Sequence, residues 1–158
     1  MMPAIVETHV RERYHEYQHR THRTASTAQE LAAAEHVSGY RVAKAVVLKL
    51  DGALALAVVA ATDRVDLTSL EEETGSRAQL VPEAEFSERF RPCAAGAEPP
   101  LAIFGAPIYV DANLLCEPKI LMPAGTHEDS LVVDTEEWMT CERVRPVANL
   151  GRHAHGQA

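Results

Sequence analysis

The 158-residue sequence lacks what disulfide-bonded, membrane-spanning and broadly nucleic-acid-binding proteins need. Its three cysteines are odd in number and share no short metal-binding spacing, so we expect reduced thiols in a cytoplasmic protein. No apolar stretch approaches the length of a membrane span, and the N-terminus lacks the basic-then-apolar order of a signal peptide. Lysine and arginine number 15 against 23 acidic residues, a net charge of −8. This charge argues against non-specific nucleic-acid binding, which depends on neutralising phosphates, but it leaves room for a small basic rim.

Several standard catalytic signatures are also missing. The chain contains no P-loop, no dinucleotide fingerprint, no Gly-x-Ser-x-Gly elbow and no His-Glu-x-x-His motif. His15, His19 and His22 fall at helical spacing and could hold a metal, but a solvated helix is favoured because no carboxylate or cysteine completes a ligand set. Cys93 follows a proline without any sign of an activating base, which disfavours a nucleophilic role. We therefore predict neither a metal nor a cofactor.

Length and composition predict one domain of mixed structure. With 46% hydrophobic and 24% charged residues, the chain has the composition of a globular protein that buries a core without disulfides or metal. We divide it into an N-terminal helix and connector (1–24), a main domain (25–147) and a tail expected to be disordered (148–158). Short strands and helices without a regular βαβ rhythm suggest an α+β fold around a mixed sheet.

Turn and cap signals place the individual elements. Asp51-Gly52 between two apolar runs predicts a hairpin of strands over 42–50 and 53–60. Thr27 with Glu30, and Thr68 with Glu71, form capping boxes that open two helices. Further strands and one helix are expected later in the chain, with strands over 101–105, 107–111, 119–122 and 130–134 and a helix around 136–139.

A lysine on an apolar strand face is the strongest functional signal. Because successive strand side chains alternate between faces, Lys44 shares a face with Val46 and Leu48, whereas Lys49 lies on the other, which its charge marks as solvated. A buried ammonium is costly unless a cleft or a partner receives it. Lys44 is therefore a functional candidate, although a structural ion pair would produce the same pattern.

Two loops have both a functional and a purely structural interpretation. Residues 96–100 could present backbone N–H groups to a ligand, since glycine lets a backbone approach closely, or could form only a rigid turn. Gly125, Thr126 and His127 offer a flexible backbone, a hydroxyl and an imidazole, although a histidine in a surface loop is usually incidental.

Taken together, these segments resemble a known family. The order TAQE, His36, AKAVVLKLDG, LALAVVAATDRVDL, GAEPPLAIFGAPIYVD and AGTHEDSLVV is similar to that of the YbaK/prolyl-tRNA synthetase-associated domain family. The resemblance extends from about His22 to Trp138, and it is the ordered combination that is specific. It implies a single α+β domain with a strongly bent mixed β-sheet flanked by helices and a pocket on its concave side. It also implies an aminoacyl-tRNA deacylase that removes a wrong amino acid from a tRNA, the reaction called trans-editing.

The resemblance further assigns site residues. Lys44 matches the family's functional lysine, and Gly96 and Pro100 match its Gly-x-x-x-Pro loop, whose backbone helps to bind the aminoacyl ester. The other candidates fall on the late loop that closes the pocket or, as a weaker match, on its rim: Gly125, Thr126, His127, His22 and His36. The late loop departs from that of the well-studied deacylases, so the amino acid specificity does not carry over.

The implied enzyme is a hydrolase that needs no protein nucleophile, because a ribose hydroxyl of the tRNA or an oriented water attacks the ester. We expect Lys44 to contact the ester or the ribose-phosphate end, and backbone donors around Gly96 to hold the oxyanion. The implied partners are the acceptor end of a mischarged tRNA and an aminoacyl-tRNA synthetase. Two alternatives stay open: a non-catalytic small-ligand or protein-binding module of the same fold, and a regulatory protein that associates with a synthetase through the charged N-terminal segment. The amino acid, the tRNA and the oligomeric state are left open by the sequence.

Overall fold

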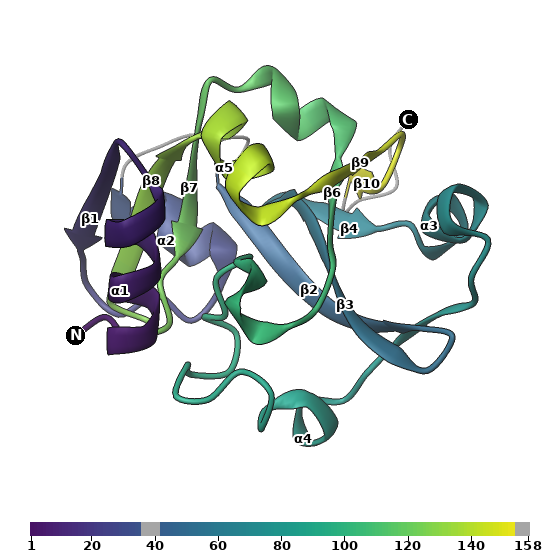
Figure 1. Ribbon diagram of the computed structural model, residues 1–158, viewed down its shortest axis with the longest axis horizontal. Coiled ribbons are helices and arrows are strands. Elements are labelled where there is room, and N and C mark those ends of the chain that lie inside the picture. The colour runs from purple at the N-terminus through teal and green to yellow at the C-terminus, as the bar shows by residue number, and fades with distance from the viewer. Residues whose placement is uncertain (36–41, 154–158) are drawn as a thin grey trace.

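The structure of the protein is a computed structural model that describes residues 1–35 and 42–153. Its helices and strands follow one another without a regular repeat (Figure 1). The helical elements are α1 (Ala4–Arg13), α2 (Ala28–Glu35), α3 (Leu67–Thr74), α4 (Glu83–Phe86), α5 (Thr135–Glu142) and the short 3-10 turns η2 (Ala102–Phe104) and η3 (Ala112–Cys116). The strands are β1 (Tyr17–Thr21), β2 (Ala43–Leu50), β3 (Ala53–Ala60), β4 (Asp63–Val65), β5 (Ala78–Leu80), β6 (Ile108–Asp111), β7 (Lys119–Pro123), β8 (Asp129–Asp134), β9 (Arg145–Val147) and β10 (Gly151–His153).

The predicted hairpin is the centre of the largest sheet. β2 and β3 pair antiparallel along their whole length, from Ala43 opposite Ala60 to Leu50 opposite Ala53. The turn between them places both Asp51 and Gly52 at positive φ, at 48° and 85°, which is the backbone that a two-residue hairpin loop requires. The Asp-Gly signal was therefore correct, and it sets the register of the strand that carries Lys44.

The largest sheet has the order β5-β2-β3-β6-β9 and is mixed. β2 pairs antiparallel with β3 and β5, whereas β6 pairs parallel with both β3 and β9. β2 thus has a paired strand along each of its two edges, and apolar clusters cover both of its faces. The face that carries Ala43 and Val47 belongs to the main apolar cluster, and Leu48 on the other face belongs to a second one.

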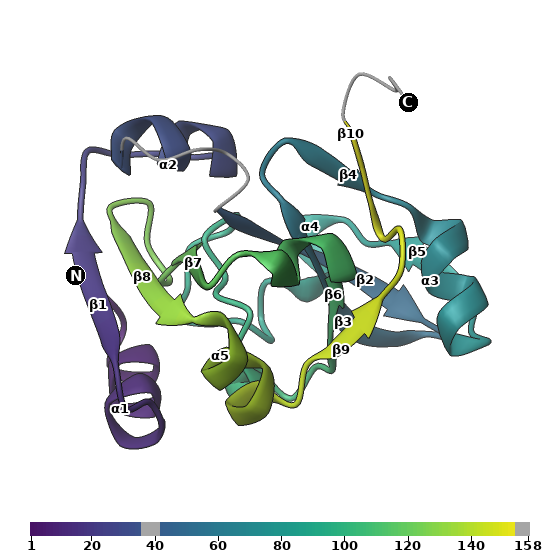
Figure 2. The ribbon, with the colours of Figure 1, turned by 90° about the horizontal axis from the view of Figure 1, so that it is seen from above.

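A second sheet lies beside the hairpin, on the side of α1 and α2 (Figures 1 and 2). Its order is β1-β8-β7, all antiparallel, and a parallel bridge between Val42 and Leu121 connects it to the start of β2. The N-terminal segment differs from the expected exposed helix and connector, because Val6 and Val10 of α1 are fully buried and residues 17–21 form β1. Backbone pairing with β8 explains why the connector is a strand.

The tail prediction was wrong for residues 151–153. These residues form β10, which pairs antiparallel with β4 so that Gly151 lies opposite Val65 and His153 opposite Asp63. Leu150 just before the strand is fully buried. Burial of this leucine and the ladder with β4 hold the segment in place, and neither can be recognised from its short polar sequence.

Two further local expectations needed correction. The Thr27–Glu30 capping box is present, with the Glu30 backbone N–H donating to Thr27 Oγ1 at 3.0 Å. The second helix is capped instead by Asp66, whose carboxylate accepts from the backbone N–H groups of residues 68 and 69. Residues 101–105 do not form a strand, since the Ala102 N–H donates at 2.7 Å to the Glu142 carboxylate and residues 102–104 adopt the 3-10 turn η2.

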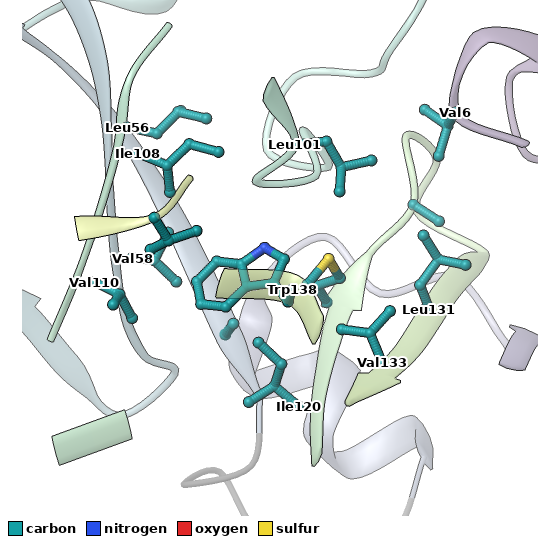
Figure 3. Packing of buried hydrophobic residues seen from close by; sticks show 14 of the residues in the cluster. Val6, Leu56, Val58, Leu101, Ile108, Val110, Ile120, Leu131, Val133 and Trp138 are labelled. Carbon is teal, nitrogen blue, oxygen red and sulfur yellow. The ribbon is translucent and has the colours of Figure 1, made fainter. Parts of the chain in front are cut away.

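The main core forms around Trp138 of α5, which is fully buried (Figure 3). Its indole N–H donates to the carbonyl of Pro100 at 2.9 Å, so the ring packs while its polar atom is satisfied. The neighbours in Figure 3 come from both sheets and from the 101–104 turn: Val58, Leu101, Ile108, Ile120, Leu131 and Val133. This core ties the 96–100 loop to the frame of the molecule.

The architecture is a single α+β domain with a mixed sheet flanked by helices, as predicted. No helix within residues 1–35 and 42–153 is long and apolar enough to cross a membrane.

Candidate functional site

A cavity of about 480 Å³ lies against β2, and it gathers most of the predicted site residues. Its volume is within the range of small-molecule sites, roughly 300–1,000 Å³. Five of the eight predicted residues line it: Lys44, Gly96, Thr126, His127 and His22. We call this cavity the pocket. Residues from three distant parts of the chain therefore converge on the strand that carries Lys44.

Lys44 is half-buried, as its strand face predicts. Its Nζ donates to the backbone carbonyl of Asp63 at the start of β4. Burial lowers the pKa of Lys44 below the ordinary lysine value, and the nearby Asp63 carboxylate opposes part of that shift. An ammonium has three donors, so one bond to a carbonyl leaves donor capacity for a ligand.

Lys49 differs from Lys44 as expected, but for another reason. Its face is not solvated, because Ala43 and Val47 on the same face pack in the main core. Lys49 lies beyond the edge of this core at the hairpin end, where its Nζ pairs with Glu85 Oε2 at 3.2 Å. The different surroundings of the two lysines therefore depend on their positions along the strand as well as on the faces that they occupy.

The loop at Gly96 has a left-handed backbone with φ of 82°. Its N–H donates to Glu98 Oε1 at 3.0 Å, and the next N–H, of Ala97, donates to the carbonyl of Ala94 at 3.0 Å. Both amides that could hold an oxyanion thus already have partners in this conformation. A Cβ on Gly96 would lie 3.7 Å from the His127 ring, which shows how closely the two loops approach.

Glu98 is the pocket residue that the sequence argument missed. Its side chain lines the pocket while the residue is only 4% exposed. Burial raises the pKa of its carboxyl group, although hydrogen bonds from its own N–H and that of Gly96 act in the opposite direction. The sequence feature that could have indicated Glu98 is that it is the single acidic residue in the otherwise apolar segment of residues 97–100.

The late loop is attached to the Gly96 loop through its backbone. The N–H of Gly125 donates to the carbonyl of Ala97 at 2.8 Å, and the N–H of Ala94 donates to the carbonyl of Gly125 at 2.9 Å. Gly125 itself does not line the pocket, because its Cα faces Pro3 and the Cys93 sulfur. In this structure its backbone joins the two loops, and a contact between Gly125 and a ligand stays a prediction.

Asp129 holds the other end of this loop. Its buried carboxylate accepts from Thr126 Oγ1 at 2.5 Å and lies 2.6 Å from His19 Nε2. Burial alone would raise the pKa of Asp129, but the hydrogen bonds from Thr126, from His19 and from the N-terminal ammonium together outweigh it and the pKa is lowered. The carboxylate thereby orients the hydroxyl of Thr126 at the pocket wall, a second arrangement that the sequence did not reveal.

The remaining candidates differ in their placement. Pro100 does not line the pocket, and its carbonyl accepts from the buried Trp138. His22 lines the pocket, with Nδ1 2.6 Å from the carbonyl of Arg23. His36 lies outside the described residues.

Nucleophile and metal hypotheses find no support in the described parts of the chain. Burial, with a smaller effect of Glu98, raises the pKa of Cys93 to about 12, so the thiol is protonated at neutral pH. The expected helical histidine row is absent, since α1 ends at Arg13 and His19 lies on β1. No group of three or more metal-ligating side chains occurs among residues 1–35 and 42–153.

Comparison with known proteins decides the family. The family model described as an aminoacyl-tRNA editing domain matches residues 22–141, which include the pocket loops and the central hairpin. The chain belongs to the aminoacyl-tRNA editing domain family. No curated protein sequence matches it.

Solved structures share the fold of this editing domain at low sequence identity. The hypothetical protein APE2540 superposes with a TM-score of 0.83 and 21% identity over 93% of this chain and 99% of its own. A scaffold used for computational grafting of epitopes gives a TM-score of 0.80 and 21% identity over 93% and 94%. A protein proposed to be a trans-editing enzyme for prolyl-tRNA synthetase gives 0.75 and 22% over 90% and 93%.

Proposed function

We propose that the protein is an aminoacyl-tRNA deacylase that hydrolyses the ester of a mischarged tRNA in trans. The observation that carries this proposal is the half-buried Lys44 ammonium in the wall of the pocket, within an editing-domain fold. A cation of this kind has no structural carboxylate partner in the side-chain contacts of the described residues, where Nζ bonds only to a carbonyl. It is therefore available to a substrate oxygen.

Lys44 would stabilise the negative charge that develops on the ester oxygen. Such preorganised charge acts strongly in a partly water-excluded site. The attacking group would be the vicinal ribose hydroxyl of the terminal adenosine or a bound water, since none of the described residues that line the pocket is a cysteine and the Cys93 thiol nearby in the chain is protonated at neutral pH. The backbone N–H of Gly96 would join the oxyanion only if Glu98 released it, so we assign the main electrostatic role to Lys44.

Selection of the amino acid would occur in the same pocket. Glu98, Thr126 and His127 present a carboxyl group, a hydroxyl and an imidazole to it. These groups favour a small or polar aminoacyl side chain over a large apolar one. Buried polar groups discriminate strongly against ligands that leave them unpaired.

The test is deacylation of a panel of mischarged tRNAs, including alanyl- and cysteinyl-tRNA specific for proline, by wild type, Lys44→Ala and Lys49→Ala. Removal of an electrostatic stabiliser typically costs about 10²–10³-fold in kcat, which is the loss that we expect for Lys44→Ala. Lys49→Ala is the matched control, since it removes a surface ion pair from the same strand, and should change the rate by less than about twofold. Unchanged turnover in Lys44→Ala would refute the mechanism.

A non-catalytic binding module is the second candidate. The observation that favours it is the occupation of the Gly96 and Ala97 amides by Glu98 and Ala94. Saturable binding of aminoacyl-tRNA without turnover on any member of the panel would support this candidate over the deacylase.

A further inference from the structure

A second cavity adjoins the pocket on the other side of Lys44. It is also about 480 Å³, and the two cavities share Lys44, Val46 and Leu80 in their walls. The other residues of this second cavity come from β4, from the start of α3 and from β10. We call it the arginine groove, because Arg64 and Arg152 line it.

The charge of the groove is opposite to that of the whole chain. Three cations, Lys44, Arg64 and Arg152, line it together with one carboxylate, that of Asp66. The chain as a whole carries a net charge of −8. A local cluster of cations on an acidic protein attracts anions to that part of its surface.

The two arginines lie directly opposite each other in the register of β4 and β10. Like charges at directly opposed positions of an antiparallel pair destabilise it, and an anion between them removes that repulsion. In the described part of the chain Arg64 has no carboxylate partner. Arg64 therefore keeps its full charge available to a negatively charged ligand, whereas Arg152 already has one carboxylate partner, Asp66.

Arg152 is held in place by the cap of α3. Its Nε donates to Oδ2 of Asp66, while Oδ1 of Asp66 accepts from the backbone N–H groups of Thr68 and Ser69. The Arg152 side chain is nevertheless 71% exposed, so the two Nη groups keep donors for a ligand. Arginine is suited to phosphate because its planar fork matches two phosphate oxygens.

We propose that the arginine groove binds backbone phosphates of the single-stranded 3′ end of an RNA whose terminal residue occupies the pocket. This inference rests on the proposed function, since it places the next nucleotides of the same tRNA. Lys44 at the shared wall would lie between the ester and the first phosphate. β10 lies outside residues 22–141, the segment that the family model matches.

The test compares Arg64→Gln, Arg152→Gln and the double variant with Arg11→Gln. Arg11 is a matched control, because it is similarly exposed, pairs with Glu7, and lies on α1 at the opposite side of the molecule (Figures 1 and 2). The first measurement is binding of a labelled, uncharged RNA minihelix ending in CCA, by fluorescence anisotropy over a range of salt concentrations. Loss of charge-assisted bonds should weaken binding roughly tenfold in the double variant. The slope of log K against log salt should decrease in magnitude by about 0.7 for each arginine removed.

The second measurement is kcat/KM for mischarged tRNA and for the 2′(3′)-aminoacyl ester of adenosine, which has no backbone phosphate. The double variant should lose about tenfold on tRNA, in line with the binding loss, and nothing on the adenosine ester. Absence of RNA binding by wild type, or equal affinity and salt slope in all four variants, would overturn the proposal. If binding depends on the arginines but no ester is hydrolysed, the groove is supported and the deacylase proposal fails. If hydrolysis occurs and the arginines have no effect, only the groove proposal fails.

Discussion

The backbone N–H of Gly96 donates a hydrogen bond to Oε1 of Glu98, with 3.0 Å between the two atoms. The carboxylate is buried and faces the pocket, so the loop that resembles a ligand-binding loop carries its own internal acceptor. The protonation state of Glu98 therefore affects both the charge in the pocket and the stability of the folded protein.

Glu98→Gln should make the protein more stable at pH 7. Burial raises the pKa of Glu98 in the folded state, so folding disfavours the charged form and stability decreases as pH rises from the unfolded value of about 4.3 through the folded pKa. Glutamine keeps an acceptor for the Gly96 N–H without the charge. The advantage should vanish below about pH 4, where both side chains are neutral. The difference in unfolding free energy between the variant and wild type is measured in urea across pH 3–8, with the exposed Glu72→Gln as control. A difference that does not change with pH would contradict the expectation.

Lys44 should determine the alkaline side of the pH–rate profile. Burial lowers the pKa of its ammonium, so as pH rises Lys44 loses its positive charge before an ordinary lysine does, whose pKa is about 10.4. The rate should fall with that loss of charge. Lys44→Arg keeps a positive charge throughout this range, and whatever activity it retains should not fall with the same limb. The measurement is kcat/KM between pH 6 and 10 after subtraction of uncatalysed ester hydrolysis. Identical alkaline limbs in both proteins would mean that another group is titrating.

Gly125→Ala should destabilise the protein more than Gly52→Ala. Both glycines have positive φ, 96° and 85°, so each substitution carries a backbone cost of about 1–2 kcal/mol. At Gly52 nothing lies within 4 Å of the added Cβ, whereas at Gly125 the Cβ would come within 2.7 Å of Pro3 side-chain atoms. Overpacking should therefore add roughly 1–3 kcal/mol at Gly125, measured as the difference in unfolding free energy in urea. Equal losses of stability in the two variants would show that Pro3 moves aside without cost, which would contradict the expectation.

Glu142→Ala should unfold the junction of three elements. The buried carboxylate lies 2.8 Å from His9 Nε2, and it accepts at 2.6 Å from the Tyr14 hydroxyl and at 2.7 Å from the Ala102 N–H. Its removal leaves the buried Tyr14 hydroxyl and the Ala102 N–H without their acceptor, and each such unsatisfied group costs about 1–3 kcal/mol. Glu136→Ala, on the exposed side of the same helix, should change stability by less than about 0.5 kcal/mol.

The same carboxylate should contribute to acid unfolding. Burial alone would raise the pKa of Glu142, but the hydrogen bonds from His9, Ala102 and Tyr14 outweigh it and lower the pKa. Its contribution is therefore complete above the ordinary glutamate value of about 4.3 and is lost as pH falls below it. A Glu142→Gln variant should show a flatter dependence of stability on pH between 5 and 2 than wild type does.

Local sequence signals were sufficient where the structure depends on neighbours along the chain. The hairpin follows from Asp51-Gly52 and the strand period, and the first helix of the main domain follows from the Thr27–Glu30 box. The second box failed because Asp66, two residues earlier, offers its carboxylate to the same helix end and Glu71 bonds to the Ala78 N–H instead. The carboxylates of Asp66 and Glu71 could both accept from the N–H groups at this helix end, and the tertiary structure determines that Asp66 does so.

The sequence by itself determined that Lys44 would be a cation on an apolar strand face, because side-chain direction in a strand alternates residue by residue. The loops that complete the pocket were named from their order along the chain. Only the tertiary structure decided that Glu98 takes the Gly96 amide, that Asp129 holds Thr126, and that Arg152 lies opposite Arg64. Two of these contacts sit within loops whose shape is set by packing against distant segments, and the third joins strands far apart in sequence. Burial and backbone pairing between such segments leave no periodic trace in the sequence, so the chemistry of the site emerges only when the chain is folded.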